Sequence, residues 1–250
     1  MKFIIYGYMR SGTTMLTTML NSHSQLKCYA EESVNVLPSL NNNEGINVKY
    51  PHLKPGEIKN YLNDYKIIHL VRTNTFNTAI SNYINSNKDK TKTPTAHIFS
   101  TDKLEEDNIY YITKQEKHNK QFPYANKKYH KDIDKDKIYV NSDYVRTHMI
   151  HIQNQIKQEN QTLGNHENVL NLTYEELTKN NKDVNNLDST ISEKICNFLG
   201  VDFEDMYPTT MKVNDSRYEK YISNWDEIKN LIVLSDFVYE SYVLIVSEDL

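Results

Sequence analysis

Cysteine is scarce in this sequence, with only Cys28 and Cys196 among 250 residues. Two cysteines cannot form a disulfide framework, so we expect two reduced thiols in a reducing compartment. Long apolar runs are also lacking, since none approaches the roughly 18 residues that a membrane span needs. The apolar start over residues 1–6 is too short for the core of a signal peptide. These absences predict a cytoplasmic protein without a membrane span.

Positive charge is not in excess, because 29 Lys and Arg residues face 33 Asp and Glu residues and the net charge is −4. A chain with this balance lacks the broad basic surface that nucleic acids require. No Cys/His cluster with the spacing of metal ligands is visible either. We therefore expect no nucleic-acid partner and no metal, and any anion site must be local and made of a few well-placed groups.

The apolar pattern predicts strands that alternate with helices. Short apolar runs typical of buried parallel strands occupy residues 3–6, 46–48, 66–71 and 169–172. Helical patterns occupy residues 13–21, 57–63, 76–85, 143–159, 175–179, 190–199 and 225–246. This alternation predicts an α/β fold, a parallel β-sheet flanked by helices in three layers, formed by a single domain over residues 1–250. Residues 86–137 are polar, and we expect them to form an irregular insertion.

The segment Gly7-Tyr-Met-Arg-Ser-Gly12-Thr13-Thr14 connects the first predicted strand to the first predicted helix. Backbone N–H groups and the helix dipole make such a connection an anion site. Its pattern matches the P-loop of nucleoside triphosphatases, G-x-x-x-x-G-K-[ST], except that Thr13 replaces the lysine. That lysine reaches the β- and γ-phosphates of a triphosphate. Its replacement by Thr13, with Arg10 on the other side of the loop, favours a ligand whose 5′ group carries less charge than a triphosphate. We expect the fold itself to be P-loop NTPase-like.

Residues Arg10-Ser-Gly-Thr-Thr14, followed by Leu20-Asn-Ser-His-Ser24, resemble the 5′-phosphosulfate loop of the sulfotransferases that use 3′-phosphoadenosine 5′-phosphosulfate (PAPS). The resemblance is strongest to the carbohydrate and tyrosylprotein branches, and it spans most of the chain outside residues 86–137. It implies transfer of a sulfonate group from PAPS to an acceptor hydroxyl, with adenosine 3′,5′-bisphosphate (PAP) as a product. It also implies that Arg10 stabilises the sulfonate while the loop residues hold the 5′-phosphosulfate, namely Ser11, Gly12, Thr13 and Thr14.

A nucleotide that also has a 3′-phosphate needs a second anion site. Arg72 follows the apolar run over residues 66–71, and Ser81 lies nine residues later in the next predicted helix. Arginine offers a fork that matches phosphate oxygens, and the carboxyl end of a parallel strand is where open α/β sheets bind ligands. The pair is similar to the 3′-phosphate motif of the same family. Thr78 is the alternative hydroxyl, and a surface ion pair is the alternative role for Arg72.

A hydroxyl acceptor must lose a proton, so a general base is expected near the sulfonate. The resemblance implies that Glu32, just after the first helix, is this base, with Glu31 as the second choice; both could instead be solvated loop carboxylates. His23 is a rival base, although a position at the helix end suits a capping role equally well. Lys49 resembles a Lys-x-Pro element of the family and is either a catalytic residue that neutralises the sulfonate or an ordinary surface lysine.

Near the C-terminus, Lys212 and residues 221–225 resemble the segment that closes over the nucleotide, so we expect Lys212 to contact it. The acceptor is expected to be a small molecule or a glycan with a free hydroxyl, and the sequence does not define it further. Two rival functions stay open. One is a P-loop nucleotide kinase, against which Thr13 counts, and the other is a non-catalytic nucleotide-binding module.

Overall fold

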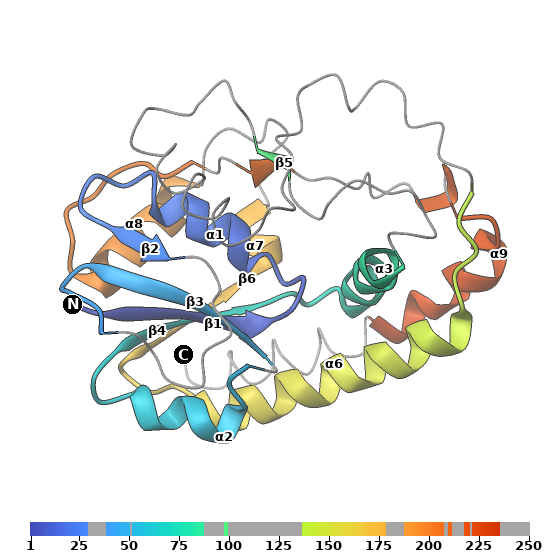
Figure 1. Cartoon of the computed structure of the whole chain (residues 1–250), viewed down its shortest axis with the longest axis horizontal. Coiled ribbons are helices and arrows are strands. Elements are labelled where there is room, and N and C mark those ends of the chain that lie inside the picture. Colours follow the sequence, from blue (N-terminus) through green and yellow to red (C-terminus); the bar gives the residue numbers. More distant parts are fainter. Residues whose placement is uncertain are drawn as a thin grey trace.

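A five-stranded parallel sheet forms the centre of the protein (Figure 1). The computed structural model describes residues 1–29, 39–50, 52–87, 98–99, 137–178, 188–207, 210–211, 218–220 and 222–235. The strand order is β2–β3–β1–β4–β6, and every neighbouring pair is parallel. The strands are β1 (Phe3–Tyr8), β2 (Lys27–Tyr29), β3 (Glu44–Tyr50), β4 (Lys66–Val71) and β6 (Val169–Thr173). This sheet confirms the predicted fold class.

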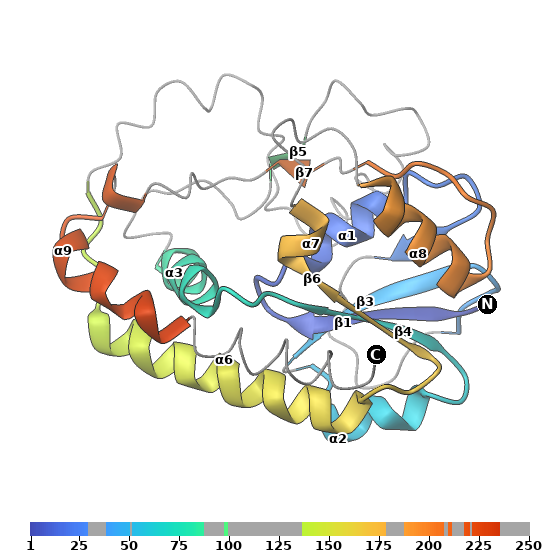
Figure 2. The ribbon, with the colours of Figure 1, turned by 180° about the vertical axis from the view of Figure 1, so that it is seen from behind.

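Helices cover both faces of the sheet, as Figures 1 and 2 show from opposite sides. On one face lie α1 (Thr13–Leu20), α7 (Tyr174–Thr178) and α8 (Ser189–Leu199). On the other face lie α2 (Pro55–Ile58), continued by η1 (Lys59–Tyr61), and α6 (Ser142–Leu163). Beyond the carboxyl ends of the strands lie α3 (Thr75–Ser86), η4 (Tyr218–Lys220), α9 (Trp225–Ile228) and η5 (Lys229–Leu231).

A separate two-stranded antiparallel sheet pairs β5 (Ile98–Phe99) with β7 (Thr210–Met211). None of the helices within the described ranges is both long enough and apolar enough to cross a membrane. Most of the predicted insertion at 86–137, and the end of the helix predicted over 225–246, lie outside the described residues.

The alternation of side chains along each strand builds one apolar layer on each face of the sheet. In β1, Phe3 and Ile5 pack among the residues of α1 and α8, whereas Ile4 and Tyr6 pack toward α2 on the opposite face. All six residues of β1 are buried. Burial on both faces explains why the strands read as continuous apolar runs.

Three local features differ from the sequence-based prediction. The first strand does not stop at Gly7 but continues to Tyr8, because Gly7 is a strand residue whose missing side chain leaves room for the carbonyl of Leu70. The helix expected from residue 57 begins two residues earlier, with Pro55 in its first turn, where a proline costs no hydrogen bond. The strand β2 was not predicted, since its three residues are too few to form a recognisable pattern.

A buried polar network joins the sheet to α6. His69 of β4 is fully buried, and its Nε2 lies 3.0 Å from Oε2 of Glu159, which is also buried. Its Nδ1 lies 2.9 Å from Oδ1 of Asn171, whose Nδ2 donates to the carbonyl of Gly164. Both ring nitrogens therefore face acceptor oxygens. Gln155 donates to the second carboxylate oxygen of Glu159 and completes the network. This geometry gives His69 a structural role, which is to join β4 to α6.

Candidate anion-binding site at the carboxyl edge of the sheet

The loop between β1 and α1 has the backbone shape of an anion cradle. Arg10 (φ 68°) and Gly12 (φ 97°) both lie in the left-handed region, on either side of Ser11. Helix α1 begins directly after Gly12, and the backbone N–H groups of its first turn have no partner within the helix. The N–H and the hydroxyl of Ser11 both donate to the carbonyl of Tyr8, at 3.2 and 2.7 Å. The Ser11 hydroxyl thus fixes the loop, and the backbone provides the cradle.

The two anion sites expected from the sequence lie side by side. Nε of Arg10 donates to Oγ of Ser81 on α3 at 3.0 Å, and Nη1 of Arg72 donates to the carbonyl of Arg10 at 3.3 Å. Thr78, the alternative hydroxyl, instead donates to the carbonyl of Asn74 at 3.2 Å. Ser81 is therefore the hydroxyl of α3 that faces the loop, and the β1 loop and the β4 end form one site.

Tyr174, the first residue of α7, supports both arginine-bearing segments. The guanidinium carbon of Arg72 lies 4.6 Å from the centre of the Tyr174 ring, a cation–π contact. The same ring fills the space beside Gly12, where any Cβ atom would overlap it. The neighbouring Glu175 accepts from the backbone N–H groups of Thr73 and Asn74, both at 3.1 Å. These contacts join segments that are about a hundred or more residues apart, so the sequence pattern could not predict them.

Charge in the site is unbalanced. Within the described residues, neither Arg10 nor Arg72 forms an ion pair with a carboxylate. Burial, and next the charge of Arg72, lower the pKa of Arg10 to about 10, so the side chain still holds its proton at neutral pH. Among the residues that the structure describes, Nε of Arg72 and the hydroxyl of Thr75 are buried and have no hydrogen-bond partner. A phosphate bound here would neutralise the adjacent positive charges and accept hydrogen bonds from the unpaired polar atoms.

Tyr218, in the C-terminal part of the chain, packs against α3. Tyr218 is buried, and its ring centre lies 6.1 Å from those of Phe76 on α3 and Trp225 on α9. Burial raises the pKa of the Tyr218 hydroxyl, while the charges of Arg72 and Arg10 oppose that rise. No motif in the sequence pointed to Tyr218.

The remaining predicted residues are placed as follows. Lys49 of β3 lies opposite Gly7 in the register with β1, at the strand end next to the loop. The side chain of Thr13 is buried and that of Thr14 is half-buried, so the helix start offers a ligand mainly their backbone N–H groups.

His23 uses both ring nitrogens, because Nε2 lies 2.9 Å from the carbonyl of Asp202 and Nδ1 accepts from the N–H of Gln25. This geometry favours the structural role for His23 at the helix end. The predicted residues Glu31, Glu32 and Lys212 lie outside the described residues.

A cluster of rings lies beside the loop, and we call it the Tyr–His cluster: Tyr8, Tyr50, Tyr144, His148 and His151. The in-register rings of Tyr8 and Tyr50 stack with centres 5.8 Å apart. The His151 ring centre is 6.0 Å from each of them, and Tyr144 stacks on His148 at 5.3 Å. Burial raises the pKa of Tyr8 to about 12 and, with His151 nearby, lowers that of His148. No sequence motif links these residues, since strand register and helix spacing bring them together.

The described residues contain no group of three or more His, Cys, Asp or Glu side chains placed to hold a metal ion. The geometry provides a candidate anion site made of a strand–loop–helix connection and a neighbouring strand end. Phosphate-binding α/β proteins hold their ligands with this kind of arrangement at the carboxyl edge of a parallel sheet.

Comparison with known proteins gives matches among solved structures only. No family model and no curated protein matches the chain. A sulfotransferase from Alicyclobacillus acidocaldarius is similar at 14% identity and a TM-score of 0.46, covering 92% of this chain and 94% of that chain. Mouse sulfotransferase SULT7A1 complexed with PAP is similar at 18% identity and a TM-score of 0.42, covering 91% of this chain and 66% of that chain. Both of these proteins are sulfotransferases, and the motifs of this sequence resemble those of a sulfotransferase family. At these identities and TM-scores, the function of the chain has to be argued from its own residues.

Proposed function

We propose that the protein is a sulfotransferase that moves a sulfonate group from PAPS to an acceptor hydroxyl and releases PAP. The observation on which this proposal rests is the convergence of Arg10, Ser81 and Arg72 at one edge of the sheet, without a carboxylate partner in the described residues. Two adjacent guanidinium groups repel each other unless an anion lies between or beside them. The site is therefore suited to a ligand with more than one negative group.

The arrangement favours a nucleotide phosphorylated at two separate positions over a triphosphate. The loop and the first turn of α1 can bind one anion through backbone N–H groups, while Arg72 and Ser81 can bind another from β4 and α3. A Mg-triphosphate site would need the loop lysine, and this chain has Thr13 there. The unpaired Nε of Arg72 and the unpaired hydroxyl of Thr75 would both gain partners from a 3′-phosphate.

The proposed reaction is a direct in-line transfer. The acceptor oxygen attacks sulfur, the bond between sulfur and the bridging oxygen of the 5′-phosphate breaks, and the acceptor proton passes to the carboxylate of Glu32. Arg10 stabilises the charge on the leaving phosphate and on the sulfonate oxygens, and Lys49 does so from the end of β3. Lys212 contacts the nucleotide from the C-terminal side. The products are a sulfate ester and PAP.

The test is transfer of radiolabelled sulfonate from PAPS to a panel of glycans, lipids, phenols and peptides. The proposal predicts labelling of at least one acceptor class by the wild-type protein. Glu32→Gln should lose at least a hundredfold in kcat, the contribution of a general base, while PAP binding stays unchanged. Glu31→Gln is the matched control and should keep its activity. Absence of transfer together with absence of PAP binding would show that the proposal is wrong, and PAP binding without any transfer would indicate a non-catalytic module.

A further inference from the structure

The segment that leaves β6 runs beside the segment that leaves β4. In their parallel register, Thr173 at the end of β6 pairs with Val71 at the end of β4. Residues 174–175 and residues 72–74 therefore continue next to each other at the carboxyl edge of the sheet, where parallel α/β proteins bind their ligands. Contacts between these two segments decide where the side chain after β4 can point.

The carboxylate of Glu175 holds the turn between β4 and α3. Its Oε2 accepts from the backbone N–H of Thr73 and its Oε1 from that of Asn74, both at 3.1 Å. The start of α7 does not need this carboxylate, because Glu176 and Thr173 already cap it by accepting each other's backbone N–H groups. Glu175 is thus left to fix the two peptide units that follow β4.

This bidentate contact leaves Arg72 available to a ligand. None of the ion pairs among the described residues joins Glu175 to Arg72. A carboxylate paired with the guanidinium would compete with a phosphate for the same donors. A carboxylate bound to backbone N–H groups instead holds the end of the strand without occupying those donors, and Nε of Arg72 keeps no hydrogen-bond partner within the described ranges.

The ring of Tyr174 holds the guanidinium of Arg72 in place from one side. The guanidinium carbon lies 4.6 Å from the ring centre, while Nη1 donates to the carbonyl of Arg10 at 3.3 Å. The ring also packs so tightly on Gly12 that a Cβ there would lie 2.4 Å from its Cδ2. An arginine ordered in this way before the ligand arrives loses less side-chain freedom on binding, which favours affinity.

We propose that Glu175 and Tyr174 are positioning residues that give the site its selectivity for a nucleotide with a 3′-phosphate. The proposal rests on the proposed sulfotransferase function and names the residues that set its donor specificity. Glu175 fixes the backbone that follows Arg72, and Tyr174 fixes the guanidinium against the loop. Neither side chain has to touch the nucleotide, because both act through the arginine.

The first experiment compares the affinities of the wild-type protein and Glu175→Gln for PAP and for adenosine 5′-monophosphate (AMP), by isothermal titration without Mg²⁺. Glutamine can accept from one of the two N–H groups, but its own NH₂ group then faces the other donor. We expect the affinity for PAP to fall about tenfold and that for AMP to change by less than about twofold.

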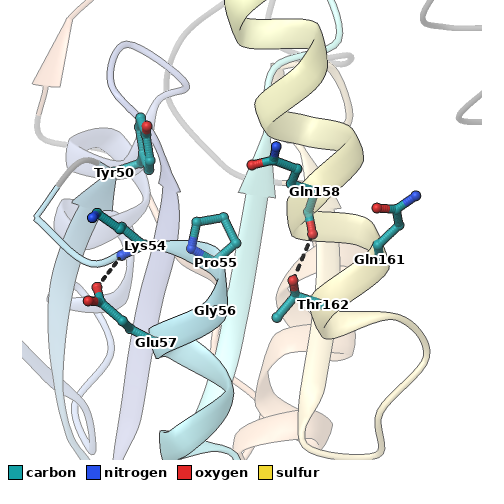
Figure 3. Close-up of a pocket in the computed structure, with 8 residues that line it drawn as sticks. All are labelled: Tyr50, Lys54, Pro55, Gly56, Glu57, Gln158, Gln161 and Thr162. Atoms are coloured by element: carbon teal, nitrogen blue, oxygen red, sulfur yellow. Dashed lines mark hydrogen bonds between the residues drawn. The ribbon is translucent and has the colours of Figure 1, made fainter.

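Glu57→Gln is the matched control. Glu57 has the same local role at the start of α2, where it accepts from the backbone N–H of Lys54 at 2.8 Å, beside the hollow between α2 and α6 (Figure 3). Loss of this contact can lower stability in the same way, so urea unfolding of both variants measures that effect. The affinities of Glu57→Gln for PAP and AMP should equal those of the wild type.

A second pair of variants tests the ring and decides the matter if Glu175→Gln does not fold. Tyr174→Leu removes the flat face that Arg72 contacts, whereas Tyr174→Phe keeps it. The difference between PAP and AMP should largely disappear in Tyr174→Leu and persist in Tyr174→Phe. Equal losses in both variants would show that the ring does not position the arginine.

The outcomes separate this inference from the proposed function. If the wild type prefers PAP and both Glu175→Gln and Tyr174→Leu keep that preference, the positioning role is wrong and the proposed function stands. A parallel fall in affinity for PAP and AMP in Glu175→Gln would indicate a structural role only and would also overturn the inference. If the wild type binds PAP and AMP equally, the inference and the proposed function fail together.

Discussion

At the scale of single residues, a few side chains hold the anion site in shape. Tyr174 stacks on the guanidinium of Arg72 and at the same time fills the space beside Gly12. Arg10 adopts a left-handed backbone conformation that is uncommon for a residue with a side chain. Its Nε is directed to Ser81 and its carbonyl to Arg72. Strain of this kind is typical of functional sites, where the surrounding structure holds it in place.

Replacing Gly12 by alanine should damage both stability and nucleotide binding. The new Cβ would overlap the ring of Tyr174, and the backbone φ of 97° is strained for any residue with a side chain. We expect a loss of roughly 1–3 kcal/mol in the free energy of unfolding, measured in urea, and weaker PAP binding. Gly56→Ala is the control, because a Cβ there meets no atom within 4 Å. Its free energy of unfolding should be unchanged or rise by up to about 1 kcal/mol. Equal effects of the two substitutions would contradict the packing of Tyr174 on the loop.

Replacing Arg10 by glutamine should weaken PAP binding without lowering the stability of the fold. Glutamine keeps a donor for Ser81 but removes one of two adjacent positive charges, whose repulsion and burial lower the pKa of Arg10. We expect PAP affinity to fall at least tenfold, the contribution of one charged hydrogen bond, as measured by isothermal titration. The free energy of unfolding of the ligand-free protein should not fall. A variant that loses stability but retains PAP affinity would show that Arg10 has a structural role only.

At the scale of elements, the strand–loop–helix units were predictable and their mutual contacts were not. The continuous apolar runs of β1 and β4, each followed by a helix, predicted both units and placed Arg10 and Arg72 at strand ends. Tyr174, Tyr218 and the Tyr–His cluster were missed, because their contacts depend on strand order and on packing between distant segments. The predicted strand over residues 46–48 is the middle of β3, and Lys49 lies inside β3, next to its last residue Tyr50. The roles of Glu32 and Lys212 stay predictions, as both lie outside the described residues.

The buried pair of His69 on β4 and Glu159 on α6 should contribute strongly to the stability of the packing between these two elements. Removing one member leaves the other buried without its partner, so His69→Leu or Glu159→Leu alone should cost about 3–5 kcal/mol of unfolding free energy. The double substitution should cost clearly less than the sum, because it removes both polar groups. Urea unfolding of the two single variants and the double variant gives the interaction energy. Additive losses would indicate that the two side chains do not act as a pair.

At the scale of the whole molecule, the order of strands places the components of the site around β1. Its neighbour β4 continues into Arg72 and α3 with Ser81, and its other neighbour β3 ends in Lys49 and Tyr50. The carboxyl ends of parallel strands meet at one edge, so groups from distant parts of the sequence become adjacent there. In the proposed function, the nucleotide is bound by groups on the β4 side of this loop.

The fold as a whole should be stabilised by PAP and not by Mg-ATP. Binding to the native state at a concentration of 100 times Kd adds about 2.7 kcal/mol, which corresponds to a rise in Tm of roughly 5–10 °C for a chain of this size. We expect this rise with PAP in the absence of Mg²⁺, measured by thermal unfolding. A comparable rise with Mg-ATP would instead favour a nucleotide kinase.

The most direct test of the central claim, one site with two anion-binding parts, is the affinity for PAP compared with adenosine 5′-monophosphate. Isothermal titration without Mg²⁺ should show PAP binding at least tenfold more tightly, because only PAP has the 3′-phosphate that Arg72 and Ser81 would bind. In Arg72→Lys, which loses the fork of the guanidinium, the difference should largely disappear. Equal affinities of the two nucleotides for the wild-type protein would contradict the claim.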